Sequence, residues 1–104
     1  MKAIIFAGQG SQKVGMGKEL VETSKAARGI FQVADEVTDG KISRVCFEGP
    51  QEELNLTVNT QPCVFTVGIA YMAAMEEKGI RADVTAGFSL GEYGALVCSR
   101  VLTF

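Results

Sequence analysis

The apolar run Ala3–Phe6 constrains the fold more than any other stretch of this chain. It shows no alternation of apolar and polar residues, which is typical of a strand that is buried on both faces in a parallel sheet. We therefore predict a strand over residues 2–6. The loop Gly8–Gln9–Gly10 follows it directly. Open parallel sheets bind ligands at the carboxyl ends of their strands, so this loop is a candidate site.

A second apolar run, Val84–Ala86, precedes the stretch GFSLGE at residues 87–92. A strand, a tight turn flanked by two glycines and a following helix form the context in which Gly-x-Ser-x-Gly presents a nucleophile. Ser89 is the candidate nucleophile, and the backbone N–H of Leu90 could donate to a developing oxyanion. The structural alternative is a helix-capping serine, with Glu92 completing a capping box.

The segment between the two strands is predicted to be helical. An amphipathic helix should begin after Ser24 and end near Gly40, and a short helix should cover Gln51–Leu54. Residues 42–47 could form a helical turn or a strand. A longer helix is expected from Thr60, with proline in its first turn, to Lys78, and it should be largely buried. Strand, helices, strand and helix in this order predict an α/β domain with parallel strands.

Composition excludes several classes of protein. The chain has 104 residues, of which 47% are hydrophobic, as is typical of a globular protein. Its formal net charge of -2 lacks the excess of positive charge that would favour binding to nucleic acid or to an anionic membrane. The longest apolar stretch, Cys63–Met75, is too short to cross a bilayer. The three cysteines, Cys46, Cys63 and Cys98, lack metal-ligand spacing. We expect them to be reduced thiols in a cytoplasmic protein without a metal.

The glycine loop matches neither of the common phosphate-binding patterns. A dinucleotide fingerprint needs a third glycine where Lys13 stands. A P-loop ending at Gly17–Lys18 needs glycine at Gln12 and a hydroxyl residue at Glu19. Two interpretations of the loop stay open: a tight turn after a strand, or backbone N–H groups pointing into a site.

Three motifs together resemble a known family. They are FAGQGSQKVGMG at residues 6–17, TQP at 60–62 and GFSLGEYGALV at 87–97. In this order and at these separations they resemble the malonyl-CoA:acyl carrier protein transacylases and the related acyltransferase domains of fatty-acid and polyketide synthases. The resemblance implies an α/β-hydrolase-like acyltransferase large subdomain of which residues 1–104 are the N-terminal part, with only its first strands and helices. The small ferredoxin-like subdomain of the family would be absent.

The resemblance also implies roles for particular residues. Ser89 would take the acyl group from coenzyme A as an ester and pass it to the phosphopantetheine thiol of acyl carrier protein. The backbone N–H groups of Gln9 and Leu90 would form the oxyanion hole, and Gln61 would line the substrate site. The implied partners are malonyl-CoA and acyl carrier protein, and no cofactor, nucleic acid or membrane is implied.

The chain departs from the family pattern at several points. Phe88 stands where the family usually has histidine, Arg100 stands where a small residue is common, and the chain contains no histidine to act as the general base. We therefore expect the isolated chain to be inactive, and to self-associate through apolar surface that a complete domain would cover. Two other functions remain open: a serine acyl hydrolase of the elbow type, and a non-catalytic module that binds a carrier protein.

Overall fold

The computed structural model describes residues 3–6, 10, 12–80 and 84–87. Two strands, β1 (Ala3–Phe6) and β2 (Val84–Gly87), pair in parallel, and Ala3 lies opposite Val84. Both strand predictions are confirmed within the described residues, and so is their parallel pairing. The α/β class is therefore confirmed for this part of the chain.

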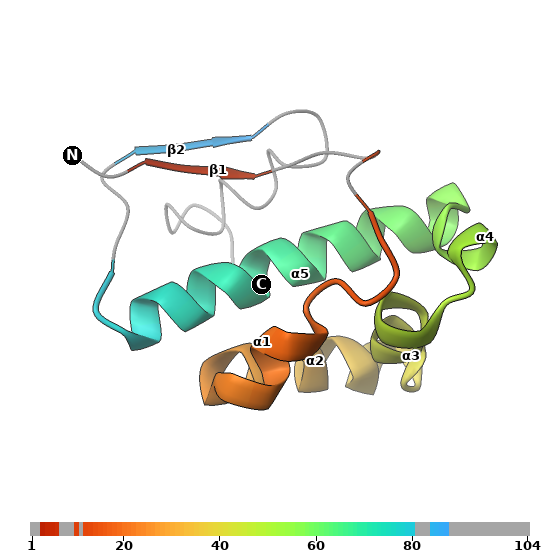
Figure 1. Ribbon diagram of the computed structural model, residues 1–104, viewed down its shortest axis with the longest axis horizontal. Helices are drawn as coiled ribbons and strands as arrows, with labels where there is room; N and C mark the ends of the chain where they lie inside the picture. Colours follow the sequence, from red (N-terminus) through yellow and green to blue (C-terminus); the bar gives the residue numbers. More distant parts are fainter. Residues whose placement is uncertain (1–2, 7–9, 11, 81–83, 88–104) are drawn as a thin grey trace.

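Within the described residues, five helices lie between the two strands in the sequence. They are α1 (Lys18–Thr23), α2 (Lys25–Thr38), α3 (Lys41–Glu48), α4 (Gln51–Leu54) and α5 (Thr57–Glu77). In Figure 1 the strands lie on one side of α5, and α1, α2 and α3 lie on its other side. Helix α5 is thus the central layer of the described molecule.

The central position of α5 explains its apolar surface. Ten of its residues are buried, among them Val64, Ile69 and Met72, which confirms the prediction that this helix is largely buried. On the side of α5 that faces the other helices, one cluster unites side chains from α2, α3, α4 and α5. Its members are Ala27, Phe31, Ile42, Val45, Cys46, Leu54, Cys63, Val67, Ala70 and Ala74.

Helix α2 begins as the sequence predicts. The Ser24 side chain accepts a hydrogen bond from the Ala27 backbone N–H at 3.1 Å, which satisfies one of the free donors at the helix start. Residues 42–47, which could have formed a turn or a strand, lie within the helix α3. The predicted short helix Gln51–Leu54 is confirmed as α4.

The predicted start of the long helix is wrong by three residues. Helix α5 begins at Thr57, and Pro62 lies inside it. The Asn59 side-chain amide donates to the Glu53 carbonyl at 2.9 Å, and the Thr60 hydroxyl donates to the carbonyls of Leu54 and Leu56. These side-chain bonds hold the extra first turn, which has no side-chain N-cap. Helix α1 was not predicted, because its six residues contain no buried side chain and hence no strong apolar period.

Candidate functional site

The two described strands end at the same edge of the sheet. Phe6 is the last residue of β1 and lies opposite Gly87, the last residue of β2. Neighbouring strands are about 4.8 Å apart. Gln9 follows Phe6 by three positions, and Ser89 follows Gly87 by two. The two connections that carry the predicted nucleophile and the predicted oxyanion hole therefore leave the sheet from adjacent positions.

Gln61, the predicted substrate-site residue, lies in α5. It is exposed and lies near the start of α5, at the end toward which both strands run in Figure 1. At 100° per residue, Gln61 points away from Cys63, Val67 and Ala70, which pack against α2 and α3. Gln61 is thus on the side of α5 that is turned from the helical core.

Side-chain amides connect the loop after β1 to α4. The Gly10 backbone N–H donates to Gln12 Oε1 at 2.8 Å, and Gln12 Nε2 donates to Asn55 Oδ1 at 3.0 Å. Asn55 Oδ1 also accepts from Gln51 Nε2 at 2.9 Å, and Gln51 Oε1 accepts from the Val14 backbone N–H at 3.0 Å. We call this set, Gly10, Gln12, Val14, Gln51 and Asn55, the amide network. It ties residues 10–14 to the junction of α4 and α5.

Two glycines permit this connection. Gly10 has φ +111°, a conformation that side-chain-bearing residues rarely adopt. Gly49 has φ +74°, and a Cβ placed there would lie 2.8 Å from Val14 Cγ2. The absence of a side chain at Gly49 lets the connection between α3 and α4 pack directly against the loop. The Gly15 backbone N–H, which donates to the Cys46 carbonyl at 2.7 Å, holds the loop from the other side.

Several predicted site residues lie outside the described residues. These are the nucleophile Ser89, the oxyanion-hole residues Gln9 and Leu90, and the altered residues Phe88 and Arg100. Their roles remain predictions. Within the described part of the chain, the structure brings together the two strand ends, and it ties Gly10, Gln12 and Val14 to Gln51 and Asn55.

The amide network itself was missed in the sequence. Gln12 breaks the P-loop pattern and lies in the motif FAGQGSQKVGMG, but neither pattern predicts its hydrogen-bond partners. A signal was present, because Gln51 and Asn55 are four positions apart and therefore share one face of a helical segment. The partner of that face, at residues 10–14, could not be identified without the fold.

The described thiols take no part in this site. Cys46 and Cys63 are free and buried, as predicted, while Cys98 lies outside the described residues. A hydrogen bond with Cys63 and burial raise the pKa of the Cys46 thiol, so Cys46 stays protonated at neutral pH. Within the ranges that the structure describes, no group of three or more metal-ligating side chains comes together.

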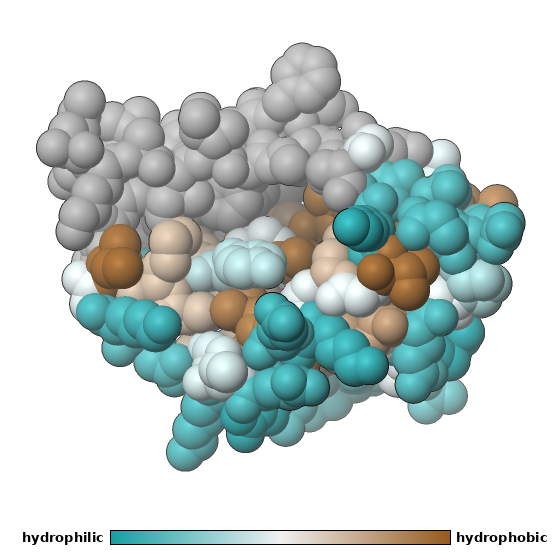
Figure 2. All heavy atoms as spheres, in the orientation of Figure 1, coloured by the Kyte–Doolittle hydropathy of each residue, from teal (hydrophilic) through white to brown (hydrophobic). Residues whose placement is uncertain are grey.

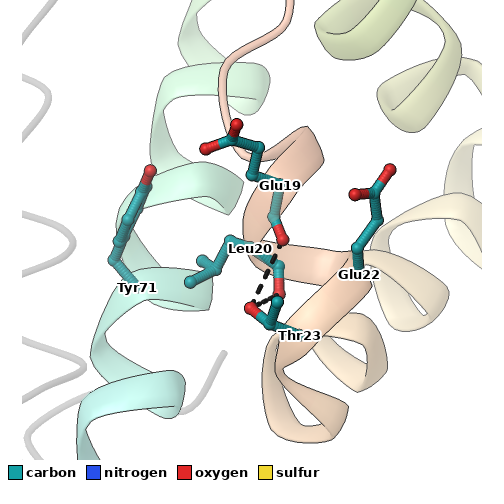
Figure 3. A pocket seen from close by; sticks show the side chains of 5 residues that line it. All are labelled: Glu19, Leu20, Glu22, Thr23 and Tyr71. Atoms are coloured by element: carbon teal, nitrogen blue, oxygen red, sulfur yellow. Dashed lines mark hydrogen bonds between the residues drawn. The ribbon is translucent and has the colours of Figure 1, made fainter.

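A hollow of about 420 Å³ lies between α1 and α5, away from the strand ends. Figure 3 shows its lining, formed by Glu19, Leu20, Glu22, Thr23 and Tyr71. The Thr23 hydroxyl already donates to the backbone carbonyls of Glu19 and Leu20. The lining thus offers carboxylates and a phenol, and no activated nucleophile. Over the described part of the chain, none of the helices has the length and apolar character of a membrane span.

Comparison with known proteins assigns the family. The family model described as the acyl transferase domain matches residues 3–104, and the chain belongs to this family. The chain is 52% identical, over 102 residues, to the malonyl CoA-acyl carrier protein transacylase of Bacillus subtilis (strain 168). That match covers 98% of this chain and 32% of the relative. The resemblance stated from the three motifs is thereby confirmed.

Solved structures agree with this assignment. The malonyl CoA-acyl carrier protein transacylase of Clostridium perfringens superposes with a TM-score of 0.91 at 36% identity, over 97% of this chain and 32% of that one. A second structure, of a type II polyketide acyl-carrier protein in complex with its malonyl-transacylase, gives a TM-score of 0.85 at 39% identity. This match covers 92% of this chain and 31% of that one. The chain therefore spans about a third of the length of the relatives it matches.

Proposed function

We propose that this chain is the N-terminal part of an α/β acyltransferase domain that moves a malonyl group from coenzyme A to acyl carrier protein. One observation carries the proposal. Strands β1 and β2 are parallel, and their last residues, Phe6 and Gly87, lie opposite each other. It supports a site to which the glycine loop, the serine elbow and Gln61 all contribute. The named relatives are transacylases of this specificity.

The proposed chemistry is a two-step transfer. The Ser89 hydroxyl attacks the thioester carbonyl of malonyl-CoA, the C–S bond breaks, and the coenzyme A thiol leaves with the serine proton. The thiol of acyl carrier protein then attacks the malonyl ester, the C–O bond breaks, and Ser89 regains its proton. The backbone N–H groups of Gln9 and Leu90 stabilise the negative oxygen in both steps. Gln61 lines the substrate site.

We infer that the general base is a histidine of the complete enzyme, as the family resemblance implies, since this chain has no histidine. We therefore infer that the 104 residues alone do not catalyse transfer at a useful rate, and that the ferredoxin-like subdomain and the base belong to the remaining two thirds of such an enzyme. A serine hydroxyl without its base loses about three or more orders of magnitude in rate. The pathway is fatty-acid or polyketide synthesis, in the cytoplasm.

A chimera tests the proposal. Residues 1–104 replace the matching first third of the Bacillus subtilis relative, and the purified chimera is incubated with malonyl-CoA. We expect mass spectrometry to locate a malonyl ester on Ser89, and holo acyl carrier protein to discharge it. Ser89→Ala should abolish labelling, whereas Thr23→Ala, which removes an exposed hydroxyl on α1, should retain it.

Three results would contradict the proposal in different ways. Discharge to water in preference to the carrier thiol would identify an acyl hydrolase. Carrier binding without any acyl-enzyme, unaffected by Ser89→Ala, would identify a non-catalytic module. Rapid labelling of the isolated 104 residues would show that no external base is needed.

We also propose that the isolated chain self-associates. Figure 2 shows hydrophobic side chains between largely hydrophilic ones on the described surface. Leu56, the residue before α5, is 56% exposed, and Val58 in the first turn of α5 is 74% exposed. Gel filtration at increasing concentration should show species larger than a monomer, and a monomer at every concentration would refute this part.

A further inference from the structure

Helix α2 carries a second apolar face besides the one that packs against α5. The core face contains Ala27 and Phe31, which are buried. Four apolar residues at helical spacing lie along a neighbouring face, which we call the α2 stripe. Its members are Ala26, Ile30, Val33 and Val37. The first two are partly buried, whereas Val33 is 46% exposed and Val37 is 82% exposed.

The opposite flank of α2 is closed by neighbouring helices. Arg28 Nε donates to the Val21 carbonyl of α1 at 2.9 Å, and Asp35 Oδ1 accepts from the Ser43 N–H of α3 at 3.0 Å. Arg28 and Asp35 are seven positions apart and therefore share one face of the helix. At 100° per residue, this face and the α2 stripe lie on opposite sides of the core face. The stripe is thus the flank of α2 that α1 and α3 leave open.

The charges beside the α2 stripe are sorted by sign along the helix. Lys25 is the first residue of α2 and Glu36 lies near its end, and both are exposed. Gly29 lies between them on the same face, and a Cβ placed there would meet no atom within 4 Å. A second α2 that runs antiparallel brings its Lys25 close to Glu36, across the space at Gly29. A parallel second helix would set like charges against each other, so the charges favour the antiparallel arrangement.

A two-fold axis through the middle of the stripe makes this pairing self-complementary. Ile30 of one copy then lies beside Val33 of the other, and Ala26 lies beside Val37. Each apolar contact occurs twice, and so does the ion pair between a lysine and a glutamate. The two helix dipoles run in opposite directions, which is also favourable. Association of this kind stops at a dimer.

We infer that the α2 stripe is a self-association surface whose occupant is the same stripe of a second copy of this chain, packed antiparallel. One helix face buries less than the standard interface of about 1,600 Å², so the dimer should be weak. Helix α2 lies on the side of α5 away from the strands (Figure 1), so this surface is separate from the described strand ends. The inference does not rest on the proposed function. It also differs from association through Leu56 and Val58, which need not stop at two copies.

Sedimentation equilibrium tests the surface in the 104-residue chain and in the chimera, at about 10 µM to 1 mM protein. Val37→Glu places a charge on the stripe while it keeps a good helix former. Gln32→Glu is the matched control, because it adds the same charge to an exposed residue of α2 that is not in the stripe. Val58→Glu adds that charge at the start of α5. We expect Val37→Glu to raise the dimer Kd by about tenfold or more, and both controls to stay within about threefold.

Charge exchange tests the antiparallel orientation. Lys25→Glu and Glu36→Lys each bring like charges together, so each should raise the dimer Kd by about fivefold to tenfold. The double variant restores opposite charges, and its Kd should return to within about threefold of the wild-type value. Circular dichroism of each variant checks that its helix content is unchanged.

Several results would overturn the inference. They are a monomeric chimera at every concentration, a dimer Kd that Val37→Glu leaves within threefold of wild type, and a double charge variant that is no tighter than the single ones. If Val37→Glu weakens binding of acyl carrier protein to the chimera and leaves the dimer intact, the stripe belongs to the carrier protein instead. A chimera that forms no ester on Ser89 would contradict the proposed function alone, because none of these measurements depends on catalysis.

Discussion

The joint between α2 and the end of α5 offers a quantitative test of what holds this fold together. Ser24 is 3% exposed, and its hydroxyl oxygen accepts from the Ala27 N–H at 3.1 Å while donating to Glu77 Oε1 at 2.9 Å. Glu77 Oε2 accepts from the Ala26 N–H at 3.0 Å. One serine and one carboxylate thus satisfy two free donors at the start of α2, and they fix this helix to the last residue of α5.

The substitution Ser24→Ala removes the first two of these bonds. Loss of an N-cap hydroxyl costs about 1 kcal/mol, and loss of a hydrogen bond to a charged acceptor costs about 1.5 kcal/mol more. Glu77 is exposed, so water recovers part of the second term. We expect the free energy of unfolding to fall by about 2 kcal/mol. A urea m-value of about 1–2 kcal/mol/M converts this into a midpoint shift of about 1–2 M.

The assay is urea denaturation of the 104-residue chain, followed by circular dichroism at one fixed low protein concentration for all variants, because self-association makes the midpoint depend on concentration. Glu77→Ala should destabilise by a smaller amount, and the double variant should lose less than the sum of the two single variants, because both act on one shared bond. The matched control is Glu36→Ala, an exposed carboxylate on α2. A Ser24→Ala midpoint that equals the wild-type midpoint would refute the reasoning, and so would strict additivity of the pair.

Two further predictions concern the connection between α3 and α5. Gly49→Ala should lower the free energy of unfolding by about 2 kcal/mol, because Gly49 has a positive φ and a Cβ there would lie 2.8 Å from Val14 Cγ2. The control is Gly29→Ala, where a Cβ meets no atom within 4 Å. It should be neutral or stabilising in the same denaturation assay. The Arg44 guanidinium, hydrogen-bonded to Glu53 at 2.9 Å, lowers the pKa of that carboxyl. The ion pair with Arg44 stabilises the fold at pH values above the pKa of an unfolded glutamate, and this stabilisation is lost as the pH falls through the lower pKa of folded Glu53. Arg44→Gln should raise the Glu53 pKa in an NMR titration. An unchanged pKa would contradict the pairing.

The parts of the fold that could be predicted are those in which a local pattern and the tertiary environment agree. Ser24 precedes a segment in which apolar residues recur about every 3.6 positions, and it is the N-cap of α2 in the structure. Ala3–Phe6 and Val84–Ala86 are short continuous apolar runs, and both lie in strands. The apolar circumference of residues 64–75 predicted a buried helix, because only a helix covered on several sides needs apolar residues all round.

The parts that could not be predicted depend on distant partners. The first turn of α5 is stabilised by side-chain bonds from Asn59 and Thr60 to carbonyls of residues 53, 54 and 56, so Pro62 gave a misleading start signal. Val58, whose carbonyl would have bonded to the missing N–H of Pro62, is 74% exposed, and water can satisfy it. For the candidate site, Gln61 could be named from a motif, whereas Gln12 acquires its meaning only from Asn55, a residue far along the chain.

The parallel register of β1 and β2 also has a consequence for the order of folding. Residue 3 pairs with residue 84, so the two strands cannot meet until a long loop has closed, and loop closure is entropically costly before other contacts form. The intervening helices shorten that loop when α2 docks on α5. During synthesis, β1 leaves the ribosome long before its partner and must wait unpaired. The helical core should therefore assemble first, and the strand ends that carry the proposed chemistry should come together last.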